Sequence, residues 1–324
     1  LARAYTPSFS LLGTESLIME QSEIGNIAAM VKDCLRCGKC KPVCSTHVPR
    51  ATLLYSPRNK ILATSLLIEA FLYEEQTRRG ISLRHFDEFN DVADHCTICH
   101  KCVKPCPVDI DFGDVSIRMR NFLREQGKKK IVPAKAAAMA FLTMKDAASI
   151  RLTRKLMVDW GYAAQRLAHK LVKPLGLIQR QTKLPPATVG QPPLFATPVR
   201  SQVIHFLNKP MPARIPSRTA RALLDIEDEK IVSVIRDPRK VSADDYDGDA
   251  VFYFPGCGGE RLFSTVSLAT QALLYDIGAQ TVLPPGYLCC GYPQIAAGEA
   301  DQGQKITTDN RVLFHRVANT LNYL

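Results

Sequence analysis

Eight of the eleven cysteines fall in two short runs that share one spacing. The runs contain Cys34, Cys37, Cys40 and Cys44, and then Cys96, Cys99, Cys102 and Cys106. Both read C-x-x-C-x-x-C-x-x-x-C, the spacing that ligates iron–sulfur clusters in bacterial two-cluster ferredoxins. Three thiolates within seven residues can surround one corner of a cubane, while the fourth cysteine is carried by its spacer toward the other cluster. The spacing therefore predicts two [4Fe–4S] clusters with crossed ligation.

Crossed ligation gives each cluster three thiolates from one run and one from the other. The expected ligands of the first cluster are Cys34, Cys37, Cys40 and Cys106; those of the second are Cys96, Cys99, Cys102 and Cys44. Pro107 follows Cys106, as the motif expects, whereas Ser45 follows Cys44. His95 and His100 flank the second run. Because all cysteine positions are filled, we expect these histidines to tune the cluster rather than ligate it.

Two other uses of cysteine remain as alternatives. Structural zinc usually takes two well-separated C-x-x-C pairs, and disulfide frameworks belong to small secreted domains. Neither fits three cysteines within seven residues as well as a cluster does. The chain starts at Leu1 without a charged-then-apolar leader, so we expect a reducing compartment and a segment of a longer protein.

The composition is that of a soluble globular protein with room for two domains. Hydrophobic residues make up 46% and charged residues 23% of 324 residues. The longest apolar stretch, residues 61–73, is interrupted by polar side chains, so no membrane span is expected. We expect a cytoplasmic protein, with peripheral attachment to the inner face of the membrane as an option.

Positive charge is concentrated in the middle of the chain. The formal net charge is +11, or about +7 with two clusters bound. Between Arg118 and Arg221 there are 21 Lys and Arg against three acidic residues. Such a stripe can meet an anionic membrane surface, an acidic partner or nucleic acid, and it can equally be a solvated helical face. No nucleic-acid motif accompanies it, so nucleic acid ranks last.

The first 173 residues read as helical. Residues 1–30 are expected to be a connector, and residues 31–130 an α-helical ferredoxin domain. Ser56 and Pro57 predict the start of a buried helix that stops near Gly80. A second helix is expected from Ser82 to Asp94, and Asp111 is expected to cap a third. Residues 131–173 follow as a basic helical extension, in which we expect Trp160 to pack in the interior.

Proline then marks the clearest boundary. Nine of the 21 prolines lie between residues 174 and 216, so residues 174–248 are expected to form an extended linker. Residues 249–324 are expected to form a second domain with strands at Ala250–Phe254 and Gln280–Leu283. A weaker strand candidate, Ile231–Ile235, precedes it within the linker region.

Three thiols are expected to converge in this second domain. A tight loop over residues 255–259 and a helix from Glu260 to Asp276 separate the two strands, which predicts a right-handed parallel crossover. Cys257 and the pair Cys289–Cys290 each follow the carboxyl end of a strand. They should therefore meet at the sheet edge where open α/β sheets bind ligands.

These residues carry a resemblance to a family. Pro255-Gly256-Cys257 and, 31 residues later, Cys289-Cys290-Gly291 resemble the cysteine-rich CCG domain. That domain occurs in heterodisulfide reductases, glycolate oxidase iron–sulfur subunits, lactate-utilisation proteins and anaerobic glycerol-3-phosphate dehydrogenases. In them a helical two-cluster ferredoxin domain comes first. The resemblance implies an α + α/β chain: ferredoxin domain, linker, and the first part of a CCG domain.

The resemblance also implies a third cluster site. In heterodisulfide reductase the motif holds a non-cubane [4Fe–4S] centre, for which Cys257, Cys289 and Cys290 would be ligands here. The family completes the motif with a later C-x-x-C, and the 33 residues after Gly291 contain no cysteine. The site is therefore expected to be incomplete, and an unmetallated thiol cluster or a vicinal disulfide is the alternative.

The function implied by the resemblance is electron transfer in a flavin-dependent 2-hydroxyacid dehydrogenase of the glycolate or D-lactate type. Neither a dinucleotide-binding fingerprint nor a P-loop is present, so FAD and substrate oxidation are expected on a partner domain or subunit. A quinone or membrane-surface acceptor would receive the electrons. The rival is thiol–disulfide reduction at the CCG site, as in heterodisulfide reductase. A purely structural or regulatory cluster protein ranks third.

Overall fold

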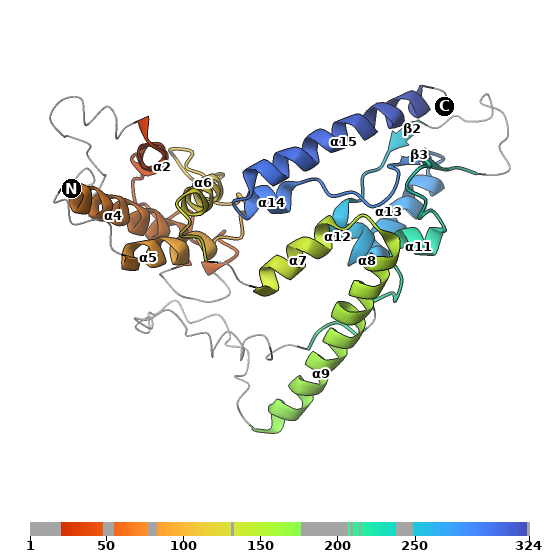
Figure 1. The fold of residues 1–324 in the computed structure, drawn as a ribbon, viewed down its shortest axis with the longest axis horizontal. Coiled ribbons are helices and arrows are strands. Elements are labelled where there is room, and N and C mark those ends of the chain that lie inside the picture. The colour runs from red at the N-terminus through yellow and green to blue at the C-terminus, as the bar shows by residue number, and fades with distance from the viewer. Residues whose placement is uncertain are drawn as a thin grey trace. The chain divides into compact units, whose positions relative to one another are not determined.

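The computed structural model describes residues 21–47, 55–76, 83–130, 133–175, 207, 210–213, 215–237 and 249–322. This part of the chain is mostly helical with one small sheet, which confirms the expected α + α/β class. It forms two compact units (Figure 1). The first contains the described residues up to Lys130 together with residues 295–300, and the second contains the others. The expected connector before residue 21, the stop at Gly80 and most of the expected linker lie outside the described residues.

Four helices build the described part of the first unit. They are α2 (Glu23–Val31), α4 (Pro57–Gln76), α5 (Leu83–Asp94) and α6 (Phe112–Glu125). Ser56 Oγ accepts from the amide of Asn59 at 3.4 Å at the start of α4, and Asp111 Oδ1 accepts from the amide of Gly113 at 2.7 Å at the start of α6. Each satisfies an amide that a helix N-terminus leaves without an intrahelical partner. The three helices expected from the sequence are confirmed.

An aromatic cluster fills the core of this unit. Phe89 is fully buried, and its ring lies 5.6 Å from the ring of Phe71 and 6.0 Å from that of Phe122, both edge to face. Val115 and Met119 of α6 are also fully buried. These side chains join α4, α5 and α6, the helices that precede and follow the second cysteine run. Their burial therefore fixes where that run begins and ends.

A long helical run dominates the amino-terminal part of the second unit. It comprises α8 (Ala147–Arg154), the π-helical turn η3 (Lys155–Trp160) and α9 (Gly161–Val172), after the shorter α7 (Pro133–Thr143). A 3₁₀ turn, η4 (Lys173–Leu175), ends it. The expectation that Trp160 packs in the interior is wrong: its side chain is 63% exposed. Periodicity alone did not show that this helix has its apolar row on the outside.

The sheet of the second unit has three short strands in the order β1-β3-β2. Strand β2 (Ala250–Phe252) is parallel to β3 (Gln280–Leu283), with Val251 paired to Thr281, which confirms the expected parallel crossover. Strand β1 (Ser233–Ile235) is antiparallel to β3. Since β1 and helix α11 (Ala220–Leu224) fall in the region expected to be an extended linker, part of that region is folded.

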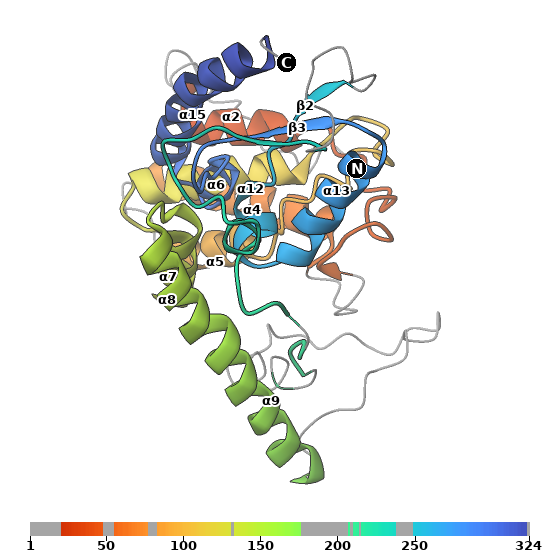
Figure 2. The same ribbon diagram turned by 90° about the vertical axis from the view of Figure 1, so that its right-hand side faces the viewer.

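The helices around the sheet differ from the expectation at one point. The predicted loop at residues 255–259 and the single helix after it are wrong, because α12 (Gly256–Arg261) begins there and a break precedes α13 (Ser264–Asp276). Gly278 has φ +83°, as a helix stop requires. Two more helices follow β3, α14 (Tyr292–Ala296) and α15 (Ala300–Leu321). Phe314 of α15 packs edge to face on Phe252 of β2, and Figure 2 shows α13 beside β3.

Among the described helices, none is both long enough and apolar enough to span a membrane.

Replacing Phe71 by Ala should destabilise the first unit by about 3–5 kcal/mol, because it opens a cavity in the aromatic cluster. Leu66→Ala is the matched control: it lies on the same helix but is 45% exposed, against 1% for Phe71. Its cost should stay within about 1 kcal/mol. Urea unfolding of the cluster-loaded protein, followed by circular dichroism, measures both. Equal costs for the two variants would contradict the assignment of the core.

Candidate metal centres

The structure brings together the cysteines expected to hold the first cluster. They line one pocket: Cys34, Cys37, Cys40 and Cys106. Apolar side chains such as Ile61 and Phe112 complete the wall, and Cys102 also reaches it. Thiols are the ligands that iron–sulfur clusters use, and an apolar wall limits access of water. The donor set and its surroundings therefore fit a cluster.

The second expected set lines a separate pocket. Its cysteines are Cys44, Cys96, Cys99 and Cys102. Lys60, His100 and Gly113 lie around the same pocket. Each pocket contains the four thiols that crossed ligation assigns to it, three from one run and one from the other, and Cys102 borders both pockets. Which atoms bind iron stays a prediction.

The two runs share an unusual backbone conformation. In the first run Arg36 and Gly38 have φ of +56° and +78°; at the equivalent positions of the second run Ile98 and His100 have φ of +51° and +55°. A positive φ is costly for a β-branched residue such as Ile98, and such strain concentrates at functional sites. In this conformation the amide of Ile98 donates to Cys96 Sγ at 3.4 Å. The local backbone thus turns a hydrogen-bond donor toward sulfur.

Burial raises the pKa of three thiols of the two runs when no metal is bound. It raises the pKa of Cys34 and Cys40, and it raises the pKa of Cys102 to about 11. Cys99 is different: partial burial opposes the shift, but hydrogen bonds led by that from Ser45 lower its pKa to about 7. Thiolates are the ligand form, so loading the buried positions must release protons.

Ser45 is a contributor that the sequence pattern did not identify. It replaces the proline that usually follows the fourth cysteine, and its Oγ donates to Cys99 Sγ at 3.3 Å. Proline has no donor to offer at this position. Hydrogen bonds to cluster sulfurs are among the factors that set a reduction potential. The departure from the motif therefore supplies a contact to the second pocket.

Two buried cations support the entry into the second run. Lys60 Nζ donates to His95 O at 2.5 Å, and Arg120 Nη2 donates to Ala93 O and Cys96 O, each at 2.7 Å. Both side chains are less than 10% exposed. They satisfy carbonyls at the end of α5 that would otherwise face an apolar interior. Sequence reasoning missed them because isolated Lys and Arg normally indicate surface.

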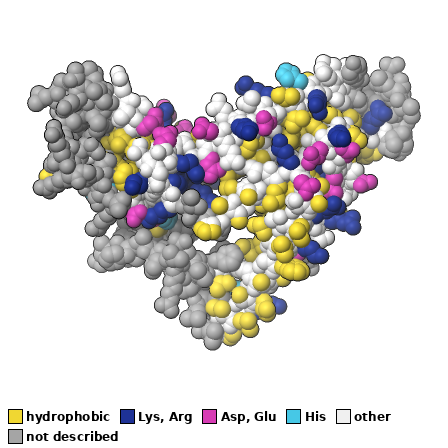
Figure 3. All heavy atoms as spheres, in the orientation of Figure 1, with side chains coloured by type: hydrophobic (Ala, Val, Ile, Leu, Met, Phe, Trp, Pro, Cys, Tyr) yellow, Lys and Arg dark blue, Asp and Glu magenta, His cyan; other side chains and the backbone are white. Residues whose placement is uncertain are grey.

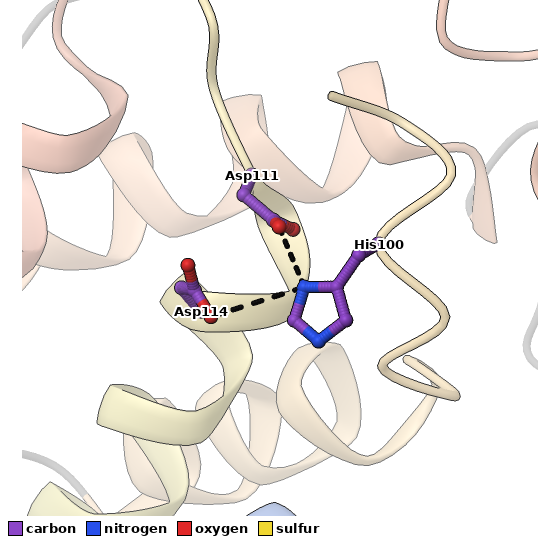
Figure 4. Close-up of side chains that lie close together, drawn as sticks. All are labelled: His100, Asp111 and Asp114. Atoms are coloured by element: carbon purple, nitrogen blue, oxygen red, sulfur yellow. Dashed lines mark hydrogen bonds and ion pairs between the residues drawn. The ribbon is translucent and has the colours of Figure 1, made fainter. Parts of the chain in front are cut away.

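His100 faces two aspartates beside the second pocket (Figure 4). Its Nδ1 lies 2.5 Å from Asp111 Oδ2 and 3.8 Å from Asp114 Oδ1. The hydrogen bond to Asp111 raises the pKa of His100. Gly113 permits this arrangement, since a Cβ there would lie 2.8 Å from His100 Nδ1. The expected role of His100 as a neighbour of the cluster rather than a ligand stays a prediction.

The three cysteines of the second unit also converge. Cys257 is the second residue of α12, the helix that follows β2, and Cys289 and Cys290 follow β3. A hydrogen bond from Cys289 lowers the pKa of Cys257 to about 7 and raises that of Cys289; a contact with Cys289 likewise raises the pKa of Cys290. The three thiols are thus close enough to shift one another's pKa, at the edge of the sheet where the topology was expected to place them.

Two side chains of helix α15 donate hydrogen bonds to the backbone of the vicinal pair Cys289–Cys290. Asn310 Nδ2 donates to Cys289 O at 2.7 Å, and Thr307 Oγ1 donates to Cys290 O at 3.4 Å. Gly291 has φ +82°, and a Cβ there would lie 2.5 Å from Gly303 O. Two features therefore require glycine at position 291 of the Cys-Cys-Gly sequence: its left-handed backbone and its close contact with α15.

Buried arginines stabilise the other side of this site. Arg261 is fully buried next to Cys257 and donates to the carbonyls of Phe141, Leu142 and Met144 at the end of α7. Burial lowers the pKa of Arg261. Arg221 Nε pairs with Glu260 Oε1 at 2.6 Å, and both side chains are buried. Positive charge of Arg261 beside Cys257 favours its thiolate.

Comparisons with known proteins match both parts of the chain. The 4Fe-4S dicluster domain family matches residues 30–110, and the cysteine-rich CCG domain family matches residues 251–320. The chain therefore combines an iron–sulfur dicluster module with a cysteine-rich module. It is similar to the probable glycolate oxidase iron-sulfur subunit of Bacillus subtilis (strain 168), with 23% identity over 285 residues.

The matched region covers 87% of this chain and 53% of that relative, so the chain spans about half the relative's length. No solved structure matches. The resemblance to iron–sulfur subunits of the glycolate oxidase family is thereby confirmed.

Crossed ligation makes a prediction that distinguishes it from ligation within each run. In a Cys106→Ala variant, the thiols of Cys34, Cys37 and Cys40 should become reactive toward iodoacetamide, while Cys44 and the thiols of the second run stay protected. Cys44→Ala is the matched control and should expose Cys96, Cys99 and Cys102 instead. Mass spectrometry of alkylated peptides from anaerobically purified protein reads out both. Exposure of the second run by Cys106→Ala would contradict crossed ligation.

Gly291→Ala should destabilise the second unit by more than about 3 kcal/mol, because it combines backbone strain with a clash against α15. Gly278→Ala separates the two effects: Gly278 has φ +83°, but nothing lies within 4 Å of an added Cβ. Its cost should be about 1 kcal/mol. Thermal unfolding of both variants gives the comparison. If both variants had the same melting temperature, close contact between Gly291 and α15 would be refuted.

Proposed function

We propose that this chain is the electron-transferring iron–sulfur segment of a flavin-dependent 2-hydroxyacid dehydrogenase of the glycolate or D-lactate type. Substrate is oxidised at FAD on a partner domain or subunit, and electrons pass through this chain to an acceptor such as a quinone. The observation that carries the proposal is the sorting of eight thiols into two neighbouring pockets, each lined by thiols from both cysteine runs. The similarity to the Bacillus subtilis protein supports the choice of substrate class.

Each pocket has side chains suited to its task. The expected ligands are Cys34, Cys37, Cys40 and Cys106 for one cluster, and Cys96, Cys99, Cys102 and Cys44 for the other. When bound, such clusters take up and release one electron at a time. The apolar walls limit water, the Ile98 amide and Ser45 hydroxyl donate to sulfur, and buried Lys60 offsets negative charge beside the second pocket. These are the factors by which a protein sets a potential.

The proposed electron transfer also sets requirements on where the clusters lie relative to the surface and where the protein lies in the cell. Electron transfer from flavin requires the partner to lie near an exposed cluster edge. Cys37 and Cys99 are the exposed cysteines of the two runs, so each pocket has one corner near solvent. We propose a cytoplasmic protein acting with a flavoprotein, with its acceptor at the inner face of the membrane.

A second candidate function rests on the CCG thiols. Cys257, Cys289 and Cys290 shift one another's pKa, and the pKa of Cys257 is lowered to about 7. A thiolate of this kind suits a third, non-cubane cluster or thiol–disulfide chemistry. In the latter case two electrons from the cubanes and two protons would reduce a substrate disulfide to two thiols, as in heterodisulfide reductase.

One experiment separates the two candidates. The full-length protein, purified anaerobically with its flavoprotein partner, should bind FAD, and glycolate or D-lactate should then bleach the visible absorbance of the clusters. Cys290→Ala should leave this bleaching intact if the CCG thiols do not mediate flavin-to-cubane transfer. Absence of flavin from the full-length protein and of any flavoprotein partner would refute the proposal. Disulfide-dependent turnover that is lost in Cys290→Ala would favour the second candidate instead.

A further inference from the structure

The helical run from α8 through η3 to α9 exposes a row of large apolar side chains. The row consists of Leu152, Leu156, Trp160, Leu167 and Leu171, which are 62%, 48%, 63%, 59% and 63% exposed. Steps of four and seven residues keep them on one face of a helix. Figure 3 shows hydrophobic side chains gathered over this run. We call these five residues the apolar stripe.

The π-helical turn η3 lies within the apolar stripe and changes the angle between successive stripe residues around the helix axis. On a regular α-helix, side chains four residues apart drift by about 40° per step around the axis. The step from Leu156 to Trp160 falls within η3, where the wider turn takes up this drift. Positions 156 and 160 are therefore closer to alignment along the helix axis than on a regular α-helix. A π turn inside an α-helix is a feature often found at functional positions.

The helix binds its own unit through a different face. Arg154, Val158 and Gln165 are buried. Arg154 donates to the carbonyls of Arg261 and Ser217, and Gln165 Oε1 accepts from the amide of Met211 at 2.8 Å. The stripe is therefore not the face by which this helix packs on the described residues of its unit.

A row of positive charge follows one edge of the stripe. Each stripe leucine is directly preceded by a basic residue: Arg151, Lys155, Arg166 and Lys170. Because each occupies the same offset, they lie on the same flank, about 100° around the helix. Asp159 is the sole acidic residue between positions 147 and 173. Two of the basic residues also have neighbours in the unit: Arg151 lies 3.6 Å from Glu227, and Arg166 donates to Pro212 O.

A second exposed apolar face provides a contrast. Helix α13 exposes Val266 and Leu273, and Ile277 directly after it is exposed too, all at least 59%, but the helix contains no Lys or Arg. That face has apolar area without charge. The α8–α9 face combines apolar side chains, a basic row and the single tryptophan of the chain, which is the composition of helices that lie in a membrane interface. Charge complementarity thus selects an anionic lipid surface as the partner.

We propose that the apolar stripe binds the surface of an anionic phospholipid bilayer, with the α8–α9 helix in the plane of the interface. The leucines and Trp160 enter the boundary between headgroups and acyl chains, and the basic row contacts lipid phosphates. Each Lys or Arg near such a surface strengthens binding, and salt screens the contribution. The inference stands on this helix alone and does not depend on the identity of the flavin substrate. It gives the proposed electron transfer a site near a membrane acceptor.

Trp160 makes the test specific, since no other residue of the chain gives indole fluorescence. The cluster-loaded full-length protein, in which tryptophans outside residues 1–324 are replaced by Phe, is mixed with phosphatidylcholine vesicles with or without phosphatidylglycerol. It should sediment with the anionic vesicles only, and less at high salt. Trp160 emission should shift to the blue and be quenched by lipids brominated on their acyl chains. Unshifted and unquenched emission in sedimented protein would overturn insertion of the stripe.

Two variants distinguish binding through the apolar stripe from non-specific hydrophobic binding to vesicles. Leu156→Gln/Leu167→Gln keeps good helix formers at exposed positions and should weaken vesicle binding at least about tenfold. Leu273→Gln on α13 is the control: its leucine is 62% exposed, against 48% for Leu156 and 59% for Leu167, and the variant should bind as the parent does. Retained visible absorbance and circular dichroism check folding. Equal binding by the stripe variant, or equal loss in the control, would refute the proposal. A third outcome would also refute the proposal: the parent does not bind vesicles, and the stripe variant no longer binds the flavoprotein. The apolar stripe would then be a protein interface.

Discussion

Two cysteine runs separated by 51 residues have to reach the same place with their thiols facing one another. The rest of the first unit depends on this constraint. Helix α4 lies between the runs, α5 leads into the second run and α6 leaves it, and the aromatic cluster around Phe89 joins the three. Lys60 and Arg120 then fix the carbonyls at the entry to the second run. A helical core thus does the positioning that local chain geometry could not do over such a distance.

The same principle recurs in the second unit on a different scaffold. Here the carboxyl ends of two parallel strands bring Cys257 close to Cys289 and Cys290, and α15 closes on Gly291. Buried Arg261 ties α12 to the end of α7 and puts positive charge beside the thiols. In both units, side chains with buried charge satisfy backbone carbonyls next to the sulfurs. The cost of burying those cations is offset by hydrogen bonds to several carbonyls at once.

Much of this arrangement could be predicted from the sequence because its signals are local. Cysteine spacing gave the two sets, Ser56 and Asp111 marked helix starts, and the strand pattern at Gln280–Leu283 gave the parallel crossover. What could not be predicted depends on tertiary contacts. The left-handed backbone at Ile98, the buried state of Arg261 and the break between α12 and α13 have no local signature. Trp160 was misplaced for the same reason: periodicity shows that a helix has an apolar row, but not which way the row faces.

The central claim is that two cubanes lie close together because their ligands are exchanged between the runs. Electron paramagnetic resonance of the anaerobically purified, dithionite-reduced protein tests this most directly. The account predicts about two spins per chain, with a spectrum broadened and split by magnetic interaction between two reduced [4Fe–4S] clusters. Protein that contains zinc in place of iron, or whose fully reduced spectrum shows a single isolated cluster in this part of the chain, would contradict it.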